Sequence, residues 1–527
     1  MRPSLREVAQ RSYDVAVIGG GINGTGIALE AQRRGYRTLL VERNDFGSGT
    51  TSRATRLIHG GLRYLEHAEL GLVSESLGER EAMLRSYPSL VKPLRLLIPV
   101  YDGDERPGWK VRAGLALYDL LSFRKSLPRH RALPITKLDA VAPNLNRDGL
   151  RAAYTFSDAQ VAFPERVVIE TLRAFLAAGG TAINHAAVTG IVSPGNVLRA
   201  LAVHEQCSGE TAGIEAKVVV NAAGPWVDEV LRGSDAERHE TLIGGTKGSH
   251  LVVDWPDGPR HAIFASARSD GRPFFILPWY RYTLVGTTDI RYDGDPSTAR
   301  CTPEELHYLL DEATRLFPST LLTREHVLYT YSGVRPLPRT PDGSEAAITR
   351  KHFVVDHTKL GGPKGLLSIV GGKLTTYRSL SLVAADAIAK QFRAEHHSEP
   401  TSRHSERSEE SSPSLEPSPR VSSTSSPPPA PPSHDPHADT TPICEHNPET
   451  LADVARVVRE ELAVTLADVL LRRLPVGWSA CHALDGAERV GAAVAHLLGW
   501  PPERIKHELA AYERELRETL VPVSDIN

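Results

Sequence analysis

The fold of this chain is decided by the stretch Asp14-Val15-Ala16-Val17-Ile18-Gly19-Gly20-Gly21-Ile22-Asn23-Gly24. Its first half is apolar and predicts a short buried strand, and a helical pattern follows from Ile22 to about Arg34. A second apolar strand, 38–41, ends at Glu42, eighteen residues after Gly24. Strand, glycine turn, helix, strand and acid in this order predict the βαβ unit that binds a dinucleotide.

Each glycine of this loop has its own expected role. Gly19 permits the tight turn, Gly21 lets the backbone approach a pyrophosphate, and Gly24 lets the helix pack on the strand. The start of the helix offers unpaired N–H groups and the positive end of its dipole to the phosphates. Glu42 stands where a carboxylate accepts hydrogen bonds from ribose hydroxyls.

Residues 46–65 are rich in glycine, serine, threonine and arginine, and they show no strand pattern before Leu57-Ile58. Small residues and hydroxyl groups let a backbone run close to a large flat ligand and donate hydrogen bonds to it. This composition favours a flavin over a nicotinamide. Taken alone, the segment is also compatible with a flexible surface loop.

The block from Ile18 to Glu66, which contains Leu57-Ile58-His59-Gly60-Gly61-Leu62-Arg63-Tyr64-Leu65, resembles the FAD-dependent glycerol-3-phosphate dehydrogenase family. Five later stretches resemble the same family, so that motifs in order cover about residues 13–392: 221–226, 247–250, 286–289, 331–337 and 371–378. The resemblance implies FAD as cofactor, sn-glycerol 3-phosphate as substrate and a quinone as electron acceptor at a membrane surface.

The resemblance also implies which residues contact the FAD. They are Gly19, Gly21, Ile22, Asn23, Gly24, Glu42, Thr51, Ser52, Leu57, Ile58, His59, Gly60, Val188, Ala223, Gly224, Gly372, Leu374 and Thr375. The helix that opens at 371–376 would place N–H groups near the pyrimidine edge of the flavin and stabilise the anionic reduced ring.

Oxidation of a phosphorylated alcohol requires cations for the phosphate dianion. Arg63, Arg335, Arg350 and Lys373 lie inside or beside the family motifs. The resemblance implies that the three arginines lie near the substrate phosphate or hydroxyls and that Lys373 lies at the flavin–substrate junction. For a single arginine, a solvated salt bridge is the alternative.

The same reaction requires a base for the hydroxyl proton. His250, in Lys247-Gly248-Ser249-His250, is the first candidate, because an unperturbed imidazole titrates near pH ~6.5 and can accept a proton at neutral pH. His59, in the expected flavin loop, is the rival. A structural role is the alternative for either histidine.

Composition limits the remaining possibilities. The net charge of −3 gives no reason to expect nucleic acid as a partner. The four cysteines show no Cys-x-x-Cys spacing, so we expect no metal site and a reducing cytosol. The chain begins without a secretory signal, and no window approaches the ~20 apolar residues that span a bilayer. We therefore expect a cytoplasmic protein whose membrane contact, on the inner face of the cytoplasmic membrane, is peripheral.

We expect an α/β fold with three parts. A Rossmann-like FAD-binding domain comprises 1–90, 151–235 and 331–393, and an antiparallel-sheet substrate domain comprises 91–150 (a cap) and 236–330. Residues 394–446 form a disordered Ser/Pro-rich linker, because their composition cannot offset the entropy of ordering. Residues 447–527 resemble a shortened form of the family's C-terminal helical domain. Because it is short, the sequence does not decide whether this domain docks as in the family or forms a homodimer.

Three helices are expected in this last domain, at 451–473, 485–498 and 502–519. Elsewhere, the apolar stretch from Trp109 to Lys125 predicts a helix with basic ends. That helix is either buried, which is the commoner outcome, or interfacial, with Trp109 and its basic flanks among lipid headgroups.

The sequence thus predicts FAD-dependent oxidation of sn-glycerol 3-phosphate to dihydroxyacetone phosphate, with electrons passed to quinone. Three alternatives stay open. The first is an oxidase of the same family that uses oxygen, and the second is an amine or amino-acid oxidase on a related fold. The third is a degenerate flavoprotein that acts as a membrane-bound sensor or scaffold.

Overall fold

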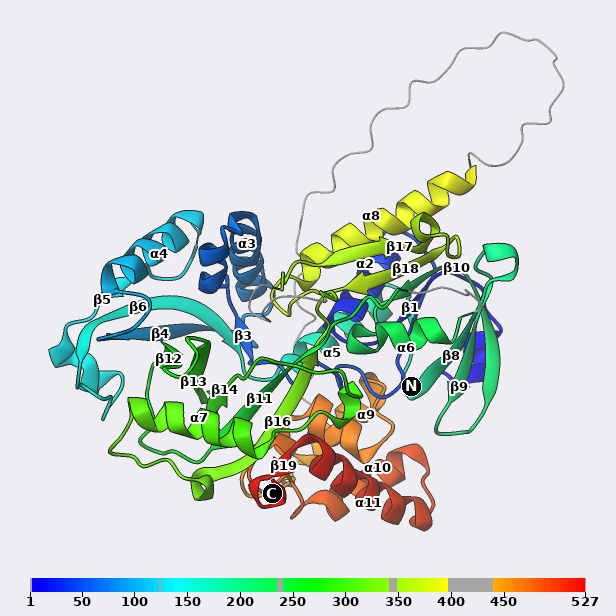
Figure 1. Ribbon diagram of the computed structural model, residues 1–527. Coiled ribbons are helices and arrows are strands. Elements are labelled where there is room, and N and C mark those ends of the chain that lie inside the picture. The colour runs from blue at the N-terminus through cyan, green and yellow to red at the C-terminus, as the bar shows by residue number, and fades with distance from the viewer. Residues whose placement is uncertain (1, 123–124, 235–239, 341–347, 397–438, 527) are drawn as a thin grey trace, which may run out of the picture.

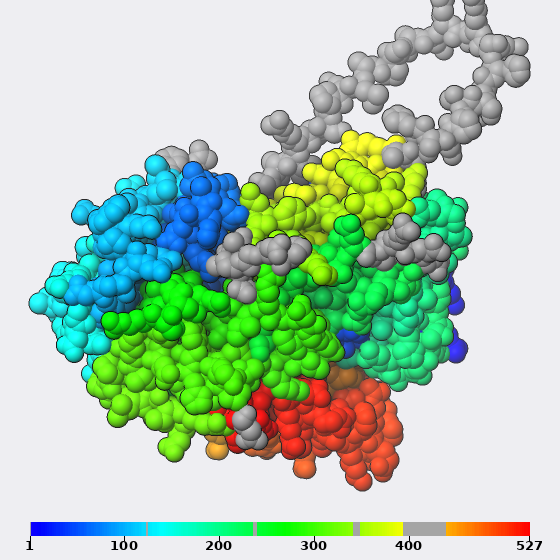
Figure 2. All heavy atoms as spheres, in the orientation of Figure 1, coloured from blue at the N-terminus to red at the C-terminus, as the bar shows by residue number. Residues whose placement is uncertain are grey.

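The computed structural model describes residues 2–122, 125–234, 240–340, 348–396 and 439–526. Most of the expected linker at 394–446 lies outside these ranges. Figure 1 shows two sheet-containing parts side by side, with the C-terminal helices, coloured orange to red, packed beneath both. The space-filling view in Figure 2 shows these helices in continuous contact with the body above them.

The first sheet of the described chain has the strand order β17-β18-β10-β1-β2-β7, and β8 and β9 extend one end of β10 as an antiparallel ribbon. Its strands are β1 (Tyr13–Ile18), β2 (Thr38–Val41), β7 (Thr181–Ile183), β8 (Ala186–Val192), β9 (Ala200–Glu205), β10 (Thr211–Asn221), β17 (Phe353–Asp356) and β18 (Leu366–Val370). Strands β10, β1 and β2 run parallel and end level at Asn221, Ile18 and Val41. The glycine loop, the 222–226 turn and Glu42 therefore meet at one edge of the sheet.

Helices cover this sheet and confirm the predicted βαβ unit. Helix α2 (Ile22–Arg33) packs against α5 (Pro164–Ala177) and α8 (Tyr377–His396). The shorter helices are α1 (Leu5–Ala9) and α6 (Val227–Arg232). The core of this part contains Val15, Val17 and Ile27, which are fully buried between the sheet and α2.

The second sheet has the order β19-β16-β11-β14-β13-β12-β4-β6-β3 in the described residues, with β15 and β5 at its margins. Its strands are β3 (Leu57–Ile58), β4 (Val91–Tyr101), β5 (Arg131–Ala132), β6 (Leu150–Val161), β11 (Thr246–Val253), β12 (Ala262–Ser266), β13 (Pro273–Trp279), β14 (Tyr282–Gly286), β15 (Ile290–Arg291), β16 (Val327–Arg335) and β19 (Val521–Pro522). The pairs are antiparallel except for β12 with β4. Strands β6 and β16 run across the boundaries expected at 150/151 and 330/331, and both belong entirely to the second sheet.

Helices α3 (Leu70–Ser86), α4 (Gly108–Leu121) and α7 (Pro303–Leu316) flank the second sheet. On α4, Leu115 and Tyr118 are buried, but Trp109 is 74% exposed and Leu120 is 70% exposed. The expectation of a buried helix is therefore wrong, because only one side of α4 packs on the sheet. No helix in the described ranges is long and apolar enough to cross a membrane.

The C-terminal domain contains α9 (Leu451–Glu460), a π-helical turn at Asp468–Arg473, α10 (Ala487–Leu498) and α11 (Pro502–Thr519). The single helix expected over 451–473 is wrong. The chain leaves α9 and passes through Leu462, whose φ is +58°. The carboxylate of Asp468 then accepts from the N–H groups of Val464 and Thr465, 2.9 and 3.1 Å away, and starts a separate helical turn.

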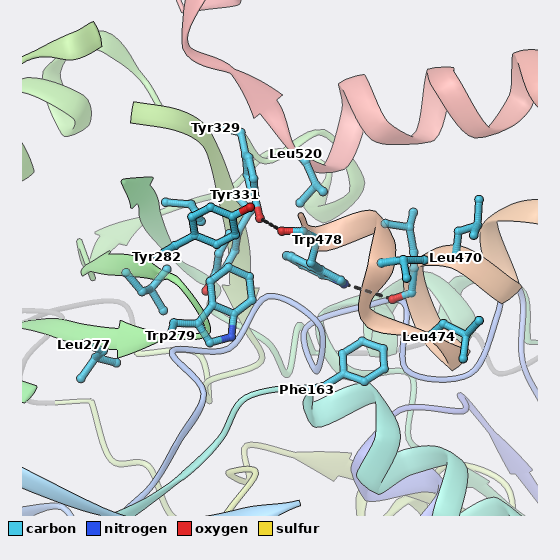
Figure 3. Packing of buried hydrophobic residues seen from close by; sticks show 14 of the residues in the cluster. Phe163, Leu277, Trp279, Tyr282, Tyr329, Tyr331, Leu470, Leu474, Trp478 and Leu520 are labelled. Atoms are coloured by element: carbon cyan, nitrogen blue, oxygen red, sulfur yellow. Dashed lines mark hydrogen bonds between the residues drawn. The ribbon is translucent and has the colours of Figure 1, made fainter. Parts of the chain in front are cut away.

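An aromatic cluster joins this domain to the second sheet. In Figure 3, Trp478 lies beside Tyr331 and Trp279, with their ring centroids 5.5 and 6.1 Å from its own. The Trp478 indole N–H donates to the Leu471 carbonyl at 3.1 Å, and the Tyr329 hydroxyl donates to the Trp478 carbonyl. The Arg56 guanidinium covers Trp478 and Trp279, 4.3 and 4.5 Å from their ring centroids. The helical domain is therefore part of the main core.

A buried ionic contact joins the same domain to the first sheet. The Asp45 carboxylate, just after β2, accepts from Arg472 Nε at 2.9 Å and from Arg473 Nη1 at 2.6 Å. All three side chains are nearly or fully buried. Asn184 Nδ2 donates to the same carboxylate at 2.9 Å.

Replacement of Asp45 by Asn should destabilise the protein by about 3 kcal/mol, because it leaves buried guanidinium groups without their shared counter-charge. The midpoint of urea unfolding of the holoprotein measures this loss. Asp139→Asn is the control: its partner Arg147 is exposed, and such surface pairs contribute about 0.5 kcal/mol. Equal midpoints for the two variants would contradict a docking role for Asp45.

Candidate active site

A cavity of about 990 Å³ runs from the edge of the first sheet to the face of the second. Its wall includes Gly19 of the loop after β1, His250 of β11 and Arg335 of β16. Helix α11 of the C-terminal domain closes part of it through Glu515 and Thr519. One continuous space thus connects the dinucleotide motif with the second sheet, which carries His250 and Arg335.

The glycine loop has the close approaches that the motif predicts. Gly19 has φ +102°, and a Cβ on it would lie 2.6 Å from the Ala222 carbonyl oxygen. A Cβ on Gly24 would lie 1.9 Å from the Gly19 carbonyl oxygen. Gly21 caps α2 without a side-chain hydrogen bond, so the helix start faces the cavity with backbone N–H groups.

The polar groups around this loop fit a dinucleotide. Glu42 is aligned by two backbone N–H groups, from Gly20 at 2.5 Å and Asn44 at 2.8 Å, and burial raises the pKa of its carboxyl group. Asn23 Oδ1 is buried and has no hydrogen-bond partner among the described residues. An acid at the end of β2, a helix start on the cavity wall and an unsatisfied amide oxygen are the features that ribose and pyrophosphate would use.

Most of the residues expected to contact FAD line the cavity. They are Gly19, Gly21, Ile22, Asn23, Glu42, Thr51, Leu57, His59, Val188, Ala223, Gly224, Gly372, Leu374 and Thr375. The structure places the other four behind the wall. Gly24 packs on Gly19, Ser52 Oγ donates to the Ser48 and Gly49 carbonyls, Ile58 is buried in β3, and the Gly60 N–H donates to the Tyr118 hydroxyl.

Three of the four expected basic residues, Arg335, Arg350 and Lys373, line the cavity. Arg335 Nη1 and Arg350 Nη2 donate to the two oxygens of Asp289, at 3.0 and 2.9 Å. Arg335 also donates to Thr287 Oγ1 at 3.1 Å. Burial opposes the ionised form of Asp289, but the two guanidinium groups outweigh it and lower the pKa of the carboxyl group. Asp289 thus sets the orientation of both arginines.

Arg63 does not line the cavity, but it is near enough to Arg350 and Asp289 to feel the charge of both. Its pKa is lowered, first by burial and then by the positive charge of Arg350. Lys373 Nζ donates to Ser76 Oγ at 3.0 Å and lies 4.4 Å from the centroid of the Tyr64 ring. Burial lowers the pKa of Lys373 to about 8. The cluster has more positive than negative charge, which suits an anionic ligand.

His250 is held firmly on the cavity wall. Its imidazole stacks on Tyr331 of the neighbouring strand, with ring centroids 4.7 Å apart, and its Nε2 lies 2.9 Å from Thr55 Oγ1. A Cβ on Gly286 would lie 2.5 Å from His250 Cδ2, so glycine is required opposite it. Burial, and then the charge of Arg335, lower the pKa of His250 well below 6.5. The imidazole is therefore neutral at pH 7 and able to accept a proton.

His59 also lines the cavity, and burial lowers its pKa to about 4. Its backbone N–H donates to Thr375 Oγ1 at 3.2 Å, which joins the flavin-type loop to the start of the last helix. Both histidines are thus neutral at pH 7. His250 differs from His59 in its position, because it shares the β11–β16 face with Arg335.

The structure adds site residues that the sequence analysis did not name. Asp289 and Tyr64 lie inside the motifs 286–289 and 57–66, so their position in these motifs could have identified them as site residues. The residues of α11 on the cavity wall are Ala511, Arg514, Glu515, Glu518 and Thr519. Nothing in the sequence indicated that these residues reach the cavity, because a helix that follows a long linker can dock at many places on the protein.

Comparison with known proteins defines the class first. A family model for FAD dependent oxidoreductases matches residues 14–378. A glycerol-3-phosphate dehydrogenase from Synechocystis sp. is 45% identical over 397 residues, which are 73% of this chain and 72% of that protein. An aerobic glycerol-3-phosphate dehydrogenase from Staphylococcus haemolyticus is 36% identical over 398 residues, 74% of this chain and 69% of that protein. The chain belongs to the FAD-dependent glycerol-3-phosphate dehydrogenase family.

A solved structure extends the similarity of fold into the C-terminal domain. It is the glycerol-3-phosphate dehydrogenase from Bacillus halodurans complexed with FAD, at a TM-score of 0.69 and 24% identity. The match covers 97% of this chain and 96% of that chain. The expected Rossmann-like α/β fold is confirmed.

Proposed function

We propose that this protein oxidises sn-glycerol 3-phosphate to dihydroxyacetone phosphate with FAD and passes the electrons to a quinone. One observation carries the proposal: the cavity that begins at a dinucleotide-type glycine loop is also lined by three basic residues, Arg335, Arg350 and Lys373, and by the neutral His250. Membership of the glycerol-3-phosphate dehydrogenase family supports the same substrate.

The residues named from the motifs would hold the cofactor along the glycine loop, Glu42 and the 372–375 turn. FAD, when bound, supplies the acceptor for the hydride that leaves the substrate carbon. The chain itself must bind the phosphate, orient the alcohol and remove the hydroxyl proton.

Phosphate binding is assigned to the arginine pair. Arg335 and Arg350 share a single carboxylate, Asp289, so the pair carries an excess of positive charge that suits a dianion. Their rigid attachment to Asp289 limits the rotamer entropy lost on binding. Arg63 and Lys373 add to the positive potential of the same region.

Proton removal is assigned to His250. A neutral imidazole on the sheet face that carries the phosphate-binding arginine can accept the proton of the substrate hydroxyl. The Tyr331 ring beneath it and the Thr55 hydroxyl beside Nε2 keep the imidazole in one orientation. Arg335 disfavours a second positive charge nearby, so the accepted proton is readily passed on.

Contact with a membrane, where a quinone would be reached, is assigned to α4. Trp109 and Leu120 are mostly exposed on this helix, and Lys110 and Arg112 lie exposed between them. Aromatic and basic side chains on one outer helix suit the interface between lipid headgroups and acyl chains. A homodimer and a cytoplasmic location remain predictions from the sequence.

Reduction and reoxidation of the flavin test the proposal separately. Anaerobic glycerol 3-phosphate should bleach the flavin band of the holoprotein, and a soluble quinone analogue should restore it faster than oxygen does. Faster reoxidation by oxygen, with peroxide formed, would identify the oxidase alternative. Bleaching by glycine or sarcosine instead would identify an amine or amino-acid oxidase, and no bleaching by any of them would favour a sensor or scaffold.

A further inference from the structure

A second cluster of reactive side chains lies in the C-terminal helical domain, apart from the cavity. The thiols of Cys444 and Cys481, the imidazole of His446 and the carboxylate of Asp485 come together there. One ligand atom from each residue lies within 4.8 Å of those of the other three. The residues form two short pairs, Cys-x-His and Cys-x-x-x-Asp, separated by 34 residues of intervening chain.

Two tight turns bring these pairs together. The first is a small hairpin in which Pro442 and Thr450 form an antiparallel bridge and the Ile443 N–H donates to the Glu449 carbonyl at 2.9 Å. It carries Cys444 and His446. In the second, at 481–486, the Leu484 N–H donates to the Cys481 carbonyl at 3.0 Å.

The two turns are packed backbone against backbone. A Cβ on Gly486 would lie 1.9 Å from the Ile443 carbonyl oxygen, so only glycine fits at the start of α10. Arg489 Nη1 donates to the Pro442 carbonyl at 2.8 Å. His482 and Ala483 have φ values of +51° and +53°, a left-handed backbone that is uncommon for residues other than glycine. The ligand atoms therefore converge on a rigid frame.

Burial is graded across the cluster. Cys444 is 4% exposed, whereas the side chains of His446 and Asp485 are each 39% exposed. Cys444 Sγ accepts a hydrogen bond from Asn447 Nδ2 at 3.1 Å, and Cys481 Sγ lies 3.3 Å from the Ser479 hydroxyl. The Asn447 amide beside Cys444 Sγ stabilises a thiolate there, as the outer shell of a metal site does. Solvent reaches the cluster from the histidine and aspartate side.

Two thiolates, one imidazole and one carboxylate are the ligands of a tetrahedral Zn²⁺ site. Bonds of about 2.3 Å to sulfur and about 2.0 Å to nitrogen and oxygen would separate the ligand atoms by roughly 3 to 4 Å. The four ligand atoms lie within 4.8 Å of one another, so small rotations of the side chains would bring them to these separations. His446 Nδ1 and Asp485 Oδ2 are 3.9 Å apart, too far for a hydrogen bond but suitable for two ligands of one ion.

The described residues contain a second cluster of possible metal ligands, which differs from the first in its charge. Asp45, His185 and Asp468 also lie within 4.8 Å of one another, but Arg472 and Arg473 already neutralise their carboxylates. A cation would be repelled there. No arginine or lysine is ion-paired to Asp485 among the pairs of the described residues, and its nearest partner is His446, itself a ligand candidate.

We propose that Cys444, His446, Cys481 and Asp485 bind a structural Zn²⁺ ion that clasps the first turn of the helical domain to the start of α10. Two cysteinyl protons leave when the ion binds, and nothing is oxidised or reduced. The clasp connects the segment that follows the Ser/Pro-rich stretch to the helices that close the cavity. The sequence analysis expected no metal site, because neither pair has the common Cys-x-x-Cys spacing.

The metal content of tag-free, full-length holoprotein tests the proposal. We expect about one Zn per chain after exhaustive dialysis, because four-ligand sites with two thiolates bind tightly. Replacement of Zn²⁺ by Co²⁺ should produce a thiolate-to-cobalt charge-transfer band. The double variant Cys444→Ser/Cys481→Ser should lose the zinc and that band. Cys207→Ser, an exposed cysteine outside the cluster, should keep both.

A second variant covers the case in which the double variant fails to fold. Asp485→Asn keeps the shape of an exposed side chain, and we expect it to retain its flavin while its dissociation constant for Zn²⁺ rises at least about tenfold. Zinc-free protein with two titratable thiols would overturn the proposal. So would zinc retained unchanged in both variants, or a Cys444–Cys481 disulfide found by mass spectrometry of unreduced protein.

Discussion

Replacement of Arg335 by alanine should lower kcat/KM for glycerol 3-phosphate by about 100- to 1000-fold, because truncation of a hydrogen-bonded charge in a binding site costs roughly 2–5 kcal/mol. Arg335 ends β16, faces the cavity and is oriented by Asp289 and Thr287. The flavin content should be unchanged, because the glycine loop and the 372–375 turn do not depend on this side chain. Anaerobic titration with glycerol 3-phosphate, followed at the flavin band, measures the effect.

Arg339→Ala is the matched control for this experiment. Arg339 lies four residues further along the same segment, but its side chain is exposed and does not line the cavity. We expect its titration to match that of the wild type. If Arg335→Ala responded to glycerol 3-phosphate as Arg339→Ala does, the assignment of phosphate binding to the Arg335–Asp289–Arg350 group would be wrong.

Replacement of His250 by asparagine should slow flavin reduction at saturating substrate by about 10²- to 10⁴-fold, the usual contribution of a general base. Asparagine keeps a polar planar side chain beside Thr55 and Tyr331 but cannot accept the proton at neutral pH. Rapid-reaction measurements under anaerobic conditions determine this rate without the reoxidation step.

The pH dependence supplies a second criterion. Protonation removes the base, so activity is lost as the pH falls through the pKa of His250. Because burial and Arg335 lower that pKa well below 6.5, the wild-type rate should stay level from pH 7, where Lys373 with its pKa of about 8 is still charged, to below pH 6.5. A decline centred on 6.5 that disappears in His250→Asn would contradict a buried imidazole as the base, because titration of the substrate phosphate would persist in that variant.

His59→Asn separates the two candidate histidines. Burial lowers the pKa of His59 as well, to about 4, so the pH profile alone does not distinguish them. We expect His59→Asn to lower flavin content or alter the flavin spectrum, since His59 joins the loop at 57–60 to Thr375. A larger loss of reduction rate in His59→Asn than in His250→Asn would transfer the role of base to His59.

Local signals explain why much of the first sheet was predictable. The turn at Gly19, the start of α2 at Ile22 and the end of β2 at Val41 each depend on residues within a few positions of one another. The carboxyl edge of the sheet then collects the glycine loop, Glu42 and the 222–226 turn, because parallel strands in register end together. Family motifs likewise located Arg335, Arg350, Lys373 and His250 near one cavity.

Contacts between distant segments account for what the sequence analysis missed. The break after α9 depends on Asp468, whose carboxylate caps a new turn and also lies 3.0 Å from His185 Nε2, far away in the chain. The exposed side of α4 depends on which face the second sheet covers. Neither is recorded in the hydrophobic pattern of the segment itself.

The amino-acid order was therefore sufficient for the βαβ unit, the cofactor class and the choice of Arg335, Arg350, Lys373 and His250 as residues of one cavity, because these follow from short-range geometry and motif chemistry. Three-dimensional folding was needed to show Asp289 between two arginines, α11 on the cavity wall, and Cys444 beside Cys481. Each of these joins segments brought together by burial of a shared core, and that core is a property of the whole chain.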